Sequence, residues 1–353
     1  MRITIVCSVL LLFACQPNQQ LKTDLDTYKD RISNVLELEL RNAEPDLSLG
    51  FAKKSALNTQ IPTIEMNLRE FYGIESCPLK QLIAQRNTAL GKIALPSQRF
   101  IYEVEVLNVL KACIDAIKYK SESNQQTQDL ASDQEKELGL LLQWYNAKQN
   151  AYDANWANLL TQSDELYSSF ARSAGFISGD HSDDINSALV DLKYFLSLYP
   201  LSDSLMQQDM EDLELHLQSM AMHQFYARTW RSMLLITSEL AVLNYSLKQR
   251  LAEFNCKSPS NKATLDIVRN VFSKYFLMEI QPKASVLNSY YYQLAPLMEK
   301  LAKKAPLPAS FSESVVKHNT QTFENYAETM RQHIQLWQSF FSNCDISPQK
   351  IVN

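Results

Sequence analysis

Glycine is scarce in this sequence, and its distribution argues against a fold built from β-sheets. Only six glycines occur among 353 residues, and none follows Gly179. Sheet proteins depend on glycine for the positive φ angles of tight hairpin turns, whereas long helices do not. Apolar residues instead recur every three to four positions through most of the chain. The sequence therefore predicts an all-α protein, an elongated bundle of long antiparallel helices.

Recognisable motifs for catalysis or cofactor binding are also absent. The sequence contains no G-x-S-x-G, no H-E-x-x-H, no P-loop and no Rossmann fingerprint. His216 and His223 share a helical face but are two turns apart, ~10 Å, which is too far for one metal ion. We therefore expect no metal, no cofactor and a protein that is not an enzyme.

Basic charge is lacking as well. Lysine and arginine total 34 against 39 acidic residues, and the formal net charge is −5. Because the two signs are scattered, the sequence has neither the basic stripe that binds nucleic acid nor a basic cluster for anionic lipid. We expect no nucleic-acid partner.

The N-terminus has the pattern of a secretory signal peptide. Within residues 1–14 one arginine precedes an apolar stretch, which is shorter than the ~20 residues that span a bilayer. The run Leu12, Phe13 and Ala14 before Cys15 resembles the lipobox of bacterial lipoproteins. That resemblance implies cleavage before Cys15 and its lipidation with acyl chains such as palmitate, which together give stable membrane anchoring. The alternative is an ordinary cleaved signal followed by a chance cysteine.

The residue after the anchor bears on localisation. In lipoproteins an aspartate there commonly retains the protein in the inner membrane, and this chain has Gln16 instead. The lipoprotein resemblance therefore implies a chain held by its lipid at the periplasmic face of the outer membrane. Residues 15–22 would form the lipidated tether.

Four cysteines remain in the mature chain, in a compartment where disulfides form. Three pairings are possible for Cys77, Cys113, Cys256 and Cys344. We favour Cys77–Cys113 with Cys256–Cys344, because each pair then lies within one half of the chain. A zinc site is the alternative, but no C-x-x-C pair provides metal-ligand spacing.

The helical patterns divide the mature chain at residues 175–180 into an N-terminal helical half, 23–175, and a C-terminal bundle half, 180–346. Residues 42–63 have no helical period and are interpreted as a loop or an extended wrap. One long helix is expected to reach residue 174. The C-terminal half carries a heptad seam typical of nearly parallel helix packing, formed by Trp230, Met233, Thr237, Leu240, Asn244, Leu247, Leu251 and Phe254. Pro282 and Pro296 predict kinks or breaks in a later helix.

Several segments resemble a known family. Residues 77–92, continued by 96–99 and 102–103, look like the signature of a gammaproteobacterial envelope lipoprotein family known only by a domain of unknown function. Echoes follow at 270–272 and 337–338. The resemblance implies an envelope lipoprotein and carries over no activity, cofactor or catalytic residue.

The densest polar cluster surrounds a predicted helix junction. It comprises Arg86, Asn87, Lys92, Arg99, Tyr102 and Glu103. The arginines and the lysine could bind a carboxylate or phosphate group. Alternatively, Arg86 and Asn87 satisfy helix-end carbonyls while Arg99 pairs with Glu103 one turn away.

Two hypotheses about function follow. The first is a non-enzymatic binding or scaffold lipoprotein that presents a helical surface to a protein partner in the envelope. The second is a periplasmic enzyme or small-ligand binder that acts on a cell-wall or lipid substrate. Its site would be a groove between the two halves, near residues 86–103.

Overall fold

The computed structural model describes most of the chain, in the ranges 18–40, 44–62, 68–74, 77–86, 94–123, 128–173, 175–179, 185–206 and 210–346. The expected signal peptide (residues 1–14) and the expected lipidation site, Cys15, lie outside these ranges. The helical elements are α1 Gln20–Leu36, η1 Lys54–Leu57, α2 Leu68–Gly73, α3 Leu79–Arg86, α5 Pro96–Ser123, α6 Gln128–Gln162, α7 Asp164–Ala171, α8 Ile185–Ser197, α9 Asp203–Met206, α10 Asp212–His223, α11 Phe225–Glu253, η2 Pro259–Asn261, α12 Lys262–Val271, η3 Phe272–Ile280, α13 Gln281–Ala302, α14 Ala309–Lys317, η4 His318–Thr322 and α15 Phe323–Asn343.

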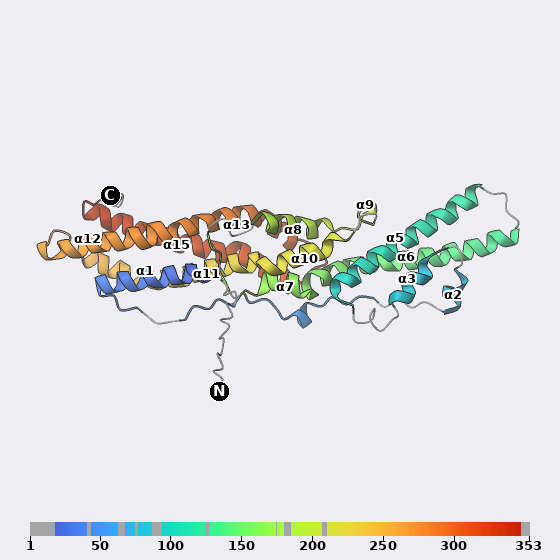
Figure 1. Ribbon diagram of the computed structural model, residues 1–353, viewed down its shortest axis with the longest axis horizontal. Helices are drawn as coiled ribbons and strands as arrows, with labels where there is room; N and C mark the ends of the chain where they lie inside the picture. The colour runs from blue at the N-terminus through green and yellow to red at the C-terminus, as the bar shows by residue number, and fades with distance from the viewer. Residues whose placement is uncertain are drawn as a thin grey trace, which may run out of the picture.

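The described residues form helices and no strand, so the prediction of an all-α protein is confirmed. The molecule is elongated: most helices form a body, and the hairpin of α5 and α6 projects from it with α2 and α3 alongside (Figure 1). We call these four helices the arm. A large hydrophobic core fills the body and the base of the hairpin, and a smaller core lies within the arm. None of the helices in the described ranges is long and apolar enough to cross a membrane.

The first helix packs on the C-terminal helices rather than on its neighbours in sequence. Leu25, Tyr28 and Ile32 recur at helical spacing and are buried. They face α11, α12 and η3, and Lys29 makes an ion pair of 2.5 Å with Glu239 of α11. The two hydrophobic cores therefore do not coincide with the sequence halves 23–175 and 180–346.

After α1 the chain returns along the body as an extended segment, residues 44–62, as the sequence predicted. An extended segment outside any sheet must satisfy its backbone carbonyls in another way. Side chains from the body do this, for example His318 to the carbonyl of Leu49 at 2.7 Å. Asn158 of α6 donates to the carbonyl of Thr59 and accepts from its amide. The segment is thus held by specific side chains of elements distant in sequence.

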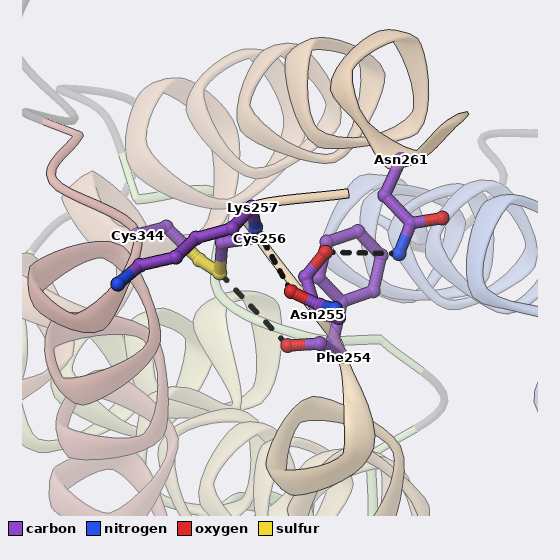
Figure 2. Close-up of a disulfide and its surroundings, with 6 residues drawn as sticks. All are labelled: Phe254, Asn255, Cys256, Lys257, Asn261 and Cys344. Carbon is purple, nitrogen blue, oxygen red and sulfur yellow. Dashed lines mark hydrogen bonds between the residues drawn. A yellow bond between two sulfur atoms is a disulfide. The ribbon is translucent and has the colours of Figure 1, made fainter. Parts of the chain in front are cut away.

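Both favoured cysteine pairs are bonded. Cys77–Cys113 joins the start of α3 to α5, with the Cα atoms 5.7 Å apart. Cys256–Cys344, with Cα atoms 5.3 Å apart, joins the loop after α11 to the end of α15 (Figure 2). Each bridge lies within one core, which is the physical reason why the local pairing is the one formed.

Two helices differ from the sequence-based expectation. The helix expected to reach residue 174 ends at Gln162, because Ser163 is extended, with φ −64° and ψ 133°, and α7 begins at Asp164. Asp164 and Glu165 are acidic residues in the first turn of α7, where the helix dipole favours negative charge. They indicate that a new helix starts here, but the apolar spacing continues across this point and predicted a single helix. Pro282 does not break its helix. It follows the π-helical segment η3, Phe272–Ile280, and π turns are one way in which a helix accommodates proline.

A buried polar network lies in the middle of the body. His333 of α15 has Asn244 of α11 on one side, with Nδ1 2.6 Å from Oδ1. Its Nε2 faces both Tyr28 and Trp337, at 2.9 and 3.1 Å. Trp337 can only donate, so Nε2 is the acceptor and Nδ1 carries the proton. Burial lowers the pKa of His333 to about 3, so the ring is neutral. Asn244, a polar member of the heptad seam, thereby fixes the register of α11 against α15.

Candidate functional site

The polar cluster predicted at residues 86–103 forms in part. Glu103 is buried and makes an ion pair of 2.6 Å with Lys148 of α6, not with Arg99. The Lys148 ammonium also lies 5.8 Å from the centre of the Tyr102 ring. Burial, with the charge of Glu103, raises the pKa of Tyr102 to about 12, and Arg86 counteracts this. The Glu103–Lys148 pair joins α5 to α6 at the base of the arm, so these two charges support the fold.

Two members of the predicted cluster, Asn87 and Lys92, lie outside the described residues. Arg86 ends α3, and Arg99 lies in the first turn of α5. The buried Nε of Arg99 has no hydrogen-bond acceptor within the described ranges. No ligand pocket among the described residues is lined by this cluster.

A pocket of about 530 Å³ lies instead where the two sequence halves meet. Its walls come from residues 47–51 of the extended segment, the end of α7 and the two residues after it, and the start of α11 with the residue before it. The described lining residues are Leu47, Ser48, Leu49, Gly50, Phe51, Tyr167, Ala171, Arg172, Ser173, Gln224 and Arg231. Its volume falls within the range of small-molecule sites.

Backbone geometry shapes this pocket. Gly50 has φ +64°, a conformation that other residues rarely adopt, and its amide lies 3.3 Å from the hydroxyl of Ser48. Tyr167 donates its hydroxyl to the carbonyl of Ala52 at 2.9 Å and so holds the extended segment against α7. Gln224, with φ 44°, is the joint between α10 and α11. The pocket is therefore built by three connections that the fold holds in place.

Two arginines give the pocket its charge. Arg231 donates through Nη1 to the carbonyl of Leu47 at 3.1 Å and lies 5.6 Å from the Phe176 ring. The buried Nε of Arg231 has no hydrogen-bond acceptor among the described residues, and burial lowers the pKa of its guanidinium. Arg172 is exposed and lies 5.2 Å from the Tyr167 ring. Neither has a carboxylate partner within the described ranges. The pocket thus holds two guanidinium groups whose charges nothing in the described protein neutralises.

A second open groove, also about 530 Å³, lies between α8 and the end of α13. Leu196 and Leu297 line it together with four lysines. Two of those lysines are engaged: Lys303 pairs with Glu299, and Lys304 donates to the carbonyl of Tyr199. This groove lacks the fixed backbone and the guanidinium groups of the first pocket.

The family model described as a protein of unknown function (DUF3080) matches residues 25–348. The chain belongs to the DUF3080 family. No curated protein and no solved structure matches it.

The histidines of this DUF3080 protein serve mainly structural contacts. His216 lies 2.7 Å from the buried carboxylate of Asp191, which also accepts the hydroxyl of Ser219 at 2.6 Å. The His216 ring stacks on Tyr194, with centroids 4.0 Å apart. His318 is satisfied by Leu49 and Thr322. No group of three or more potential metal ligands occurs in the part of the chain that the structure describes.

The pocket arginines of the DUF3080 chain were not among the residues predicted from sequence. Arg172 and Arg231 are far apart in the chain, and the fold brings them together across α7 and α11. One signal was available: Arg231 interrupts an otherwise mostly apolar run that begins at Trp230. A lone charged residue within a buried apolar stripe indicates that its side chain has either a structural partner or a ligand. Among the described residues, the hydrogen-bond acceptor of Arg231 is the carbonyl of Leu47.

Proposed function

We propose that this DUF3080 protein is a lipid-anchored, non-enzymatic binding protein at the periplasmic face of the outer membrane. In this proposal the pocket at residues 47–51, Arg172 and Arg231 receives an anionic group of the ligand. The observation that carries the proposal is the pair of guanidinium groups in a preformed pocket, neither of which has a carboxylate partner among the described residues. Guanidinium groups bind carboxylate and phosphate through paired hydrogen bonds.

The pocket chemistry favours binding over catalysis. General acid–base catalysis needs a group that can exchange a proton at the reacting centre. The described lining residues include no carboxylate, histidine, lysine or cysteine, and Tyr167 already donates its proton to Ala52. An enzyme that acts on a cell-wall or lipid substrate would therefore need groups beyond these residues.

The anchor and the pocket are tested separately. Intact mass measurement of the membrane-extracted protein should show acyl groups on Cys15, and C15A should lose them.

Inorganic phosphate should raise the melting temperature relative to chloride at equal ionic strength, because a ligand that binds only the native state stabilises it. R172Q should abolish that rise. An equal rise in R172Q would remove the support for the pocket.

A protein partner is the other part of the proposal. The arm projects from the body and offers a long helical surface (Figure 1). Tyr119 of α5 is 73% exposed on this arm. A photo-crosslinking residue at position 119 should capture an envelope protein in cells, and the same residue at buried Leu110 should not. Absence of any captured species at 119 would count against a scaffold role.

A further inference from the structure

Asn18, the first described residue, is hydrogen-bonded to Phe176, and we call the region around these two residues the waist of the body. The carbonyl of Asn18 accepts the amide of Phe176 at 2.9 Å, and its side-chain oxygen accepts the amide of Gln20 at 3.0 Å. The helix α1 starts at Gln20, near the middle of the long axis (Figure 1). Asn18 is therefore a fixed point on the body, away from either end of the elongated molecule.

The tether between this fixed point and the expected anchor is very short. Cys15 precedes Asn18 by three residues, which even fully extended span only about 11 Å. This step rests on the proposed lipidation of Cys15. An acylated Cys15 lies at the membrane interface, so the waist of the body must stay within about that distance of the lipid headgroups.

The arginine pocket adjoins the fixed point. Phe176, whose amide holds Asn18, lies with its ring 5.6 Å from the guanidinium of Arg231. The carbonyl of Phe176 accepts two hydrogen bonds from Arg228 at 2.9 and 3.0 Å. The buried residue Phe176 thus lies between Asn18 and Arg231, which lines the pocket. Because Phe176 contacts both Asn18 and Arg231, a tether that keeps Asn18 near a membrane would also keep this side of the pocket near it.

The pocket has the chemistry of a headgroup site. Arg172 and Arg231 provide cationic N–H donors, and the Nε of Arg231 has no acceptor in the part of the chain that the structure describes. Leu47, Leu49 and Phe51 form an apolar wall beside them. Phosphate esters of glycerol combine an anion that accepts several hydrogen bonds with a less polar backbone. We propose that this pocket binds the phosphate of an anionic phospholipid in the same leaflet that holds the anchor. The elongated body would then lie along the membrane, held at its waist by both the acyl chains and the bound headgroup.

The experiment uses the mature, lipidated chain purified in a nonionic detergent. Native mass spectrometry would measure retention of phosphatidylglycerol, of phosphatidylcholine as a zwitterionic control, and of glycerol 3-phosphate as a free phosphate ester. The same preparation reports the acylation of Cys15 by intact mass. The variants are R172Q, R231Q, their combination, and K300Q in the groove between α8 and α13 as a matched loss of one positive charge.

We expect phosphatidylglycerol to be retained in preference to phosphatidylcholine. Each arginine removed should lower its affinity about five-fold, as expected for one cationic side chain near an anionic lipid. K300Q should retain it as the wild type does. The Arg172 side chain is exposed and makes no hydrogen bond to the described residues, and the Arg172 amide that caps α7 is unaffected by a side-chain change, so R172Q should keep the wild-type melting temperature. R231K, which keeps the charge, controls for the loss of the Leu47 contact in R231Q.

Several outcomes would overturn the inference. Equal retention of phosphatidylglycerol by the double arginine variant would show that the lipid binds elsewhere. Binding of glycerol 3-phosphate with the same arginine dependence, but no retention of the lipid, would leave the anionic pocket standing and refute its lipid ligand. An unmodified Cys15 would refute the inference that the pocket is held beside the membrane by a lipid anchor. Failure of both phosphate compounds on an acylated chain would refute the pocket and this inference together.

Discussion

The body and the arm bury similar amphipathic helices in different ways. In the arm α5 and α6 are consecutive and pack as an antiparallel hairpin, while short α3 is bonded to α5 through Cys77–Cys113. In the body α1, the extended segment and helices α7 to α15 converge from distant parts of the sequence. A small core supplies little net stability, so a covalent bond matters more there. The arm depends on local contacts and a disulfide, whereas the body depends on long-range packing.

Buried polar groups differ between the two regions as well. Both regions enclose ion pairs. The base of the arm holds Glu103 with Lys148, and the body holds Asp24 with Lys283 at 2.9 Å. The body also encloses a neutral network, in which His333 lies between Asn244 and Trp337. A neutral network avoids the desolvation cost that buried ions incur, but it requires each donor and acceptor to be matched. The body therefore gains a fixed register, which the hairpin of the arm obtains from its connectivity.

The largest expected effect comes from removing the aromatic centre of the body. Trp337 is fully buried, and its ring centre lies 4.9 Å from that of Phe272. W337A should lower the free energy of unfolding by about 5 kcal/mol, mainly through the cavity that it leaves and also through the loss of one of the two hydrogen bonds to His333 Nε2. W337F keeps most of the ring and should cost about 2 kcal/mol. Urea titration followed by circular dichroism measures both.

The matched change in the arm is W144A, since Trp144 is buried in the smaller core. It should cost about 4 kcal/mol locally. Hydrogen exchange should show lost protection in α5 and α6 while α11 and α15 stay protected. Equal loss of protection in α11 and α15 would mean that body and arm unfold as one unit.

Removing each disulfide also tests whether the arm and the body unfold separately, with a somewhat smaller expected loss of stability than W337A. The bridges close loops of 36 and 88 residues, worth about 4 kcal/mol each by chain entropy. The double variant C77S/C113S should release α3, seen as fast amide exchange at Leu79–Arg86, and leave the thermal transition of the body in place. C256S/C344S should instead lower that transition. A drop in the body transition in C77S/C113S would contradict the division into two regions.

The sequence allowed the class of the fold and its local order to be predicted, because helical stripes and scarce glycine act within single segments. The cysteine pairs followed from the same locality. The docking of α1 on α11 could not be predicted, since many helices have a compatible apolar face. The same limit explains the site. Glu103 pairs with Lys148 on the neighbouring helix of the hairpin and not with Arg99 on its own helix. Arg172 and Arg231 line the same pocket only because tertiary packing places their helices side by side. A chain without a basic cluster in sequence can thus assemble one in space.

The smallest expected effect is a pH dependence confined to the body. Burial lowers the pKa of His333 to about 3 and also lowers that of His318, whereas a histidine in the unfolded chain titrates near 6.5. Below pH 6.5 the unfolded chain therefore binds protons that the native state excludes, and stability falls as pH decreases. From pH 7 to pH 5 His333 alone should remove about 2 kcal/mol from the free energy of unfolding.

H333Q should be less stable than the wild type at pH 7, yet its further loss of stability at pH 5 should be smaller by that amount, as measured by urea titration. Carboxylates titrate in both proteins and cancel. The arm, residues 68–162, contains no histidine, so the stability of α5 and α6 measured by amide hydrogen exchange should not show this histidine contribution. An identical loss in H333Q and wild type would mean that the buried network admits the proton without cost.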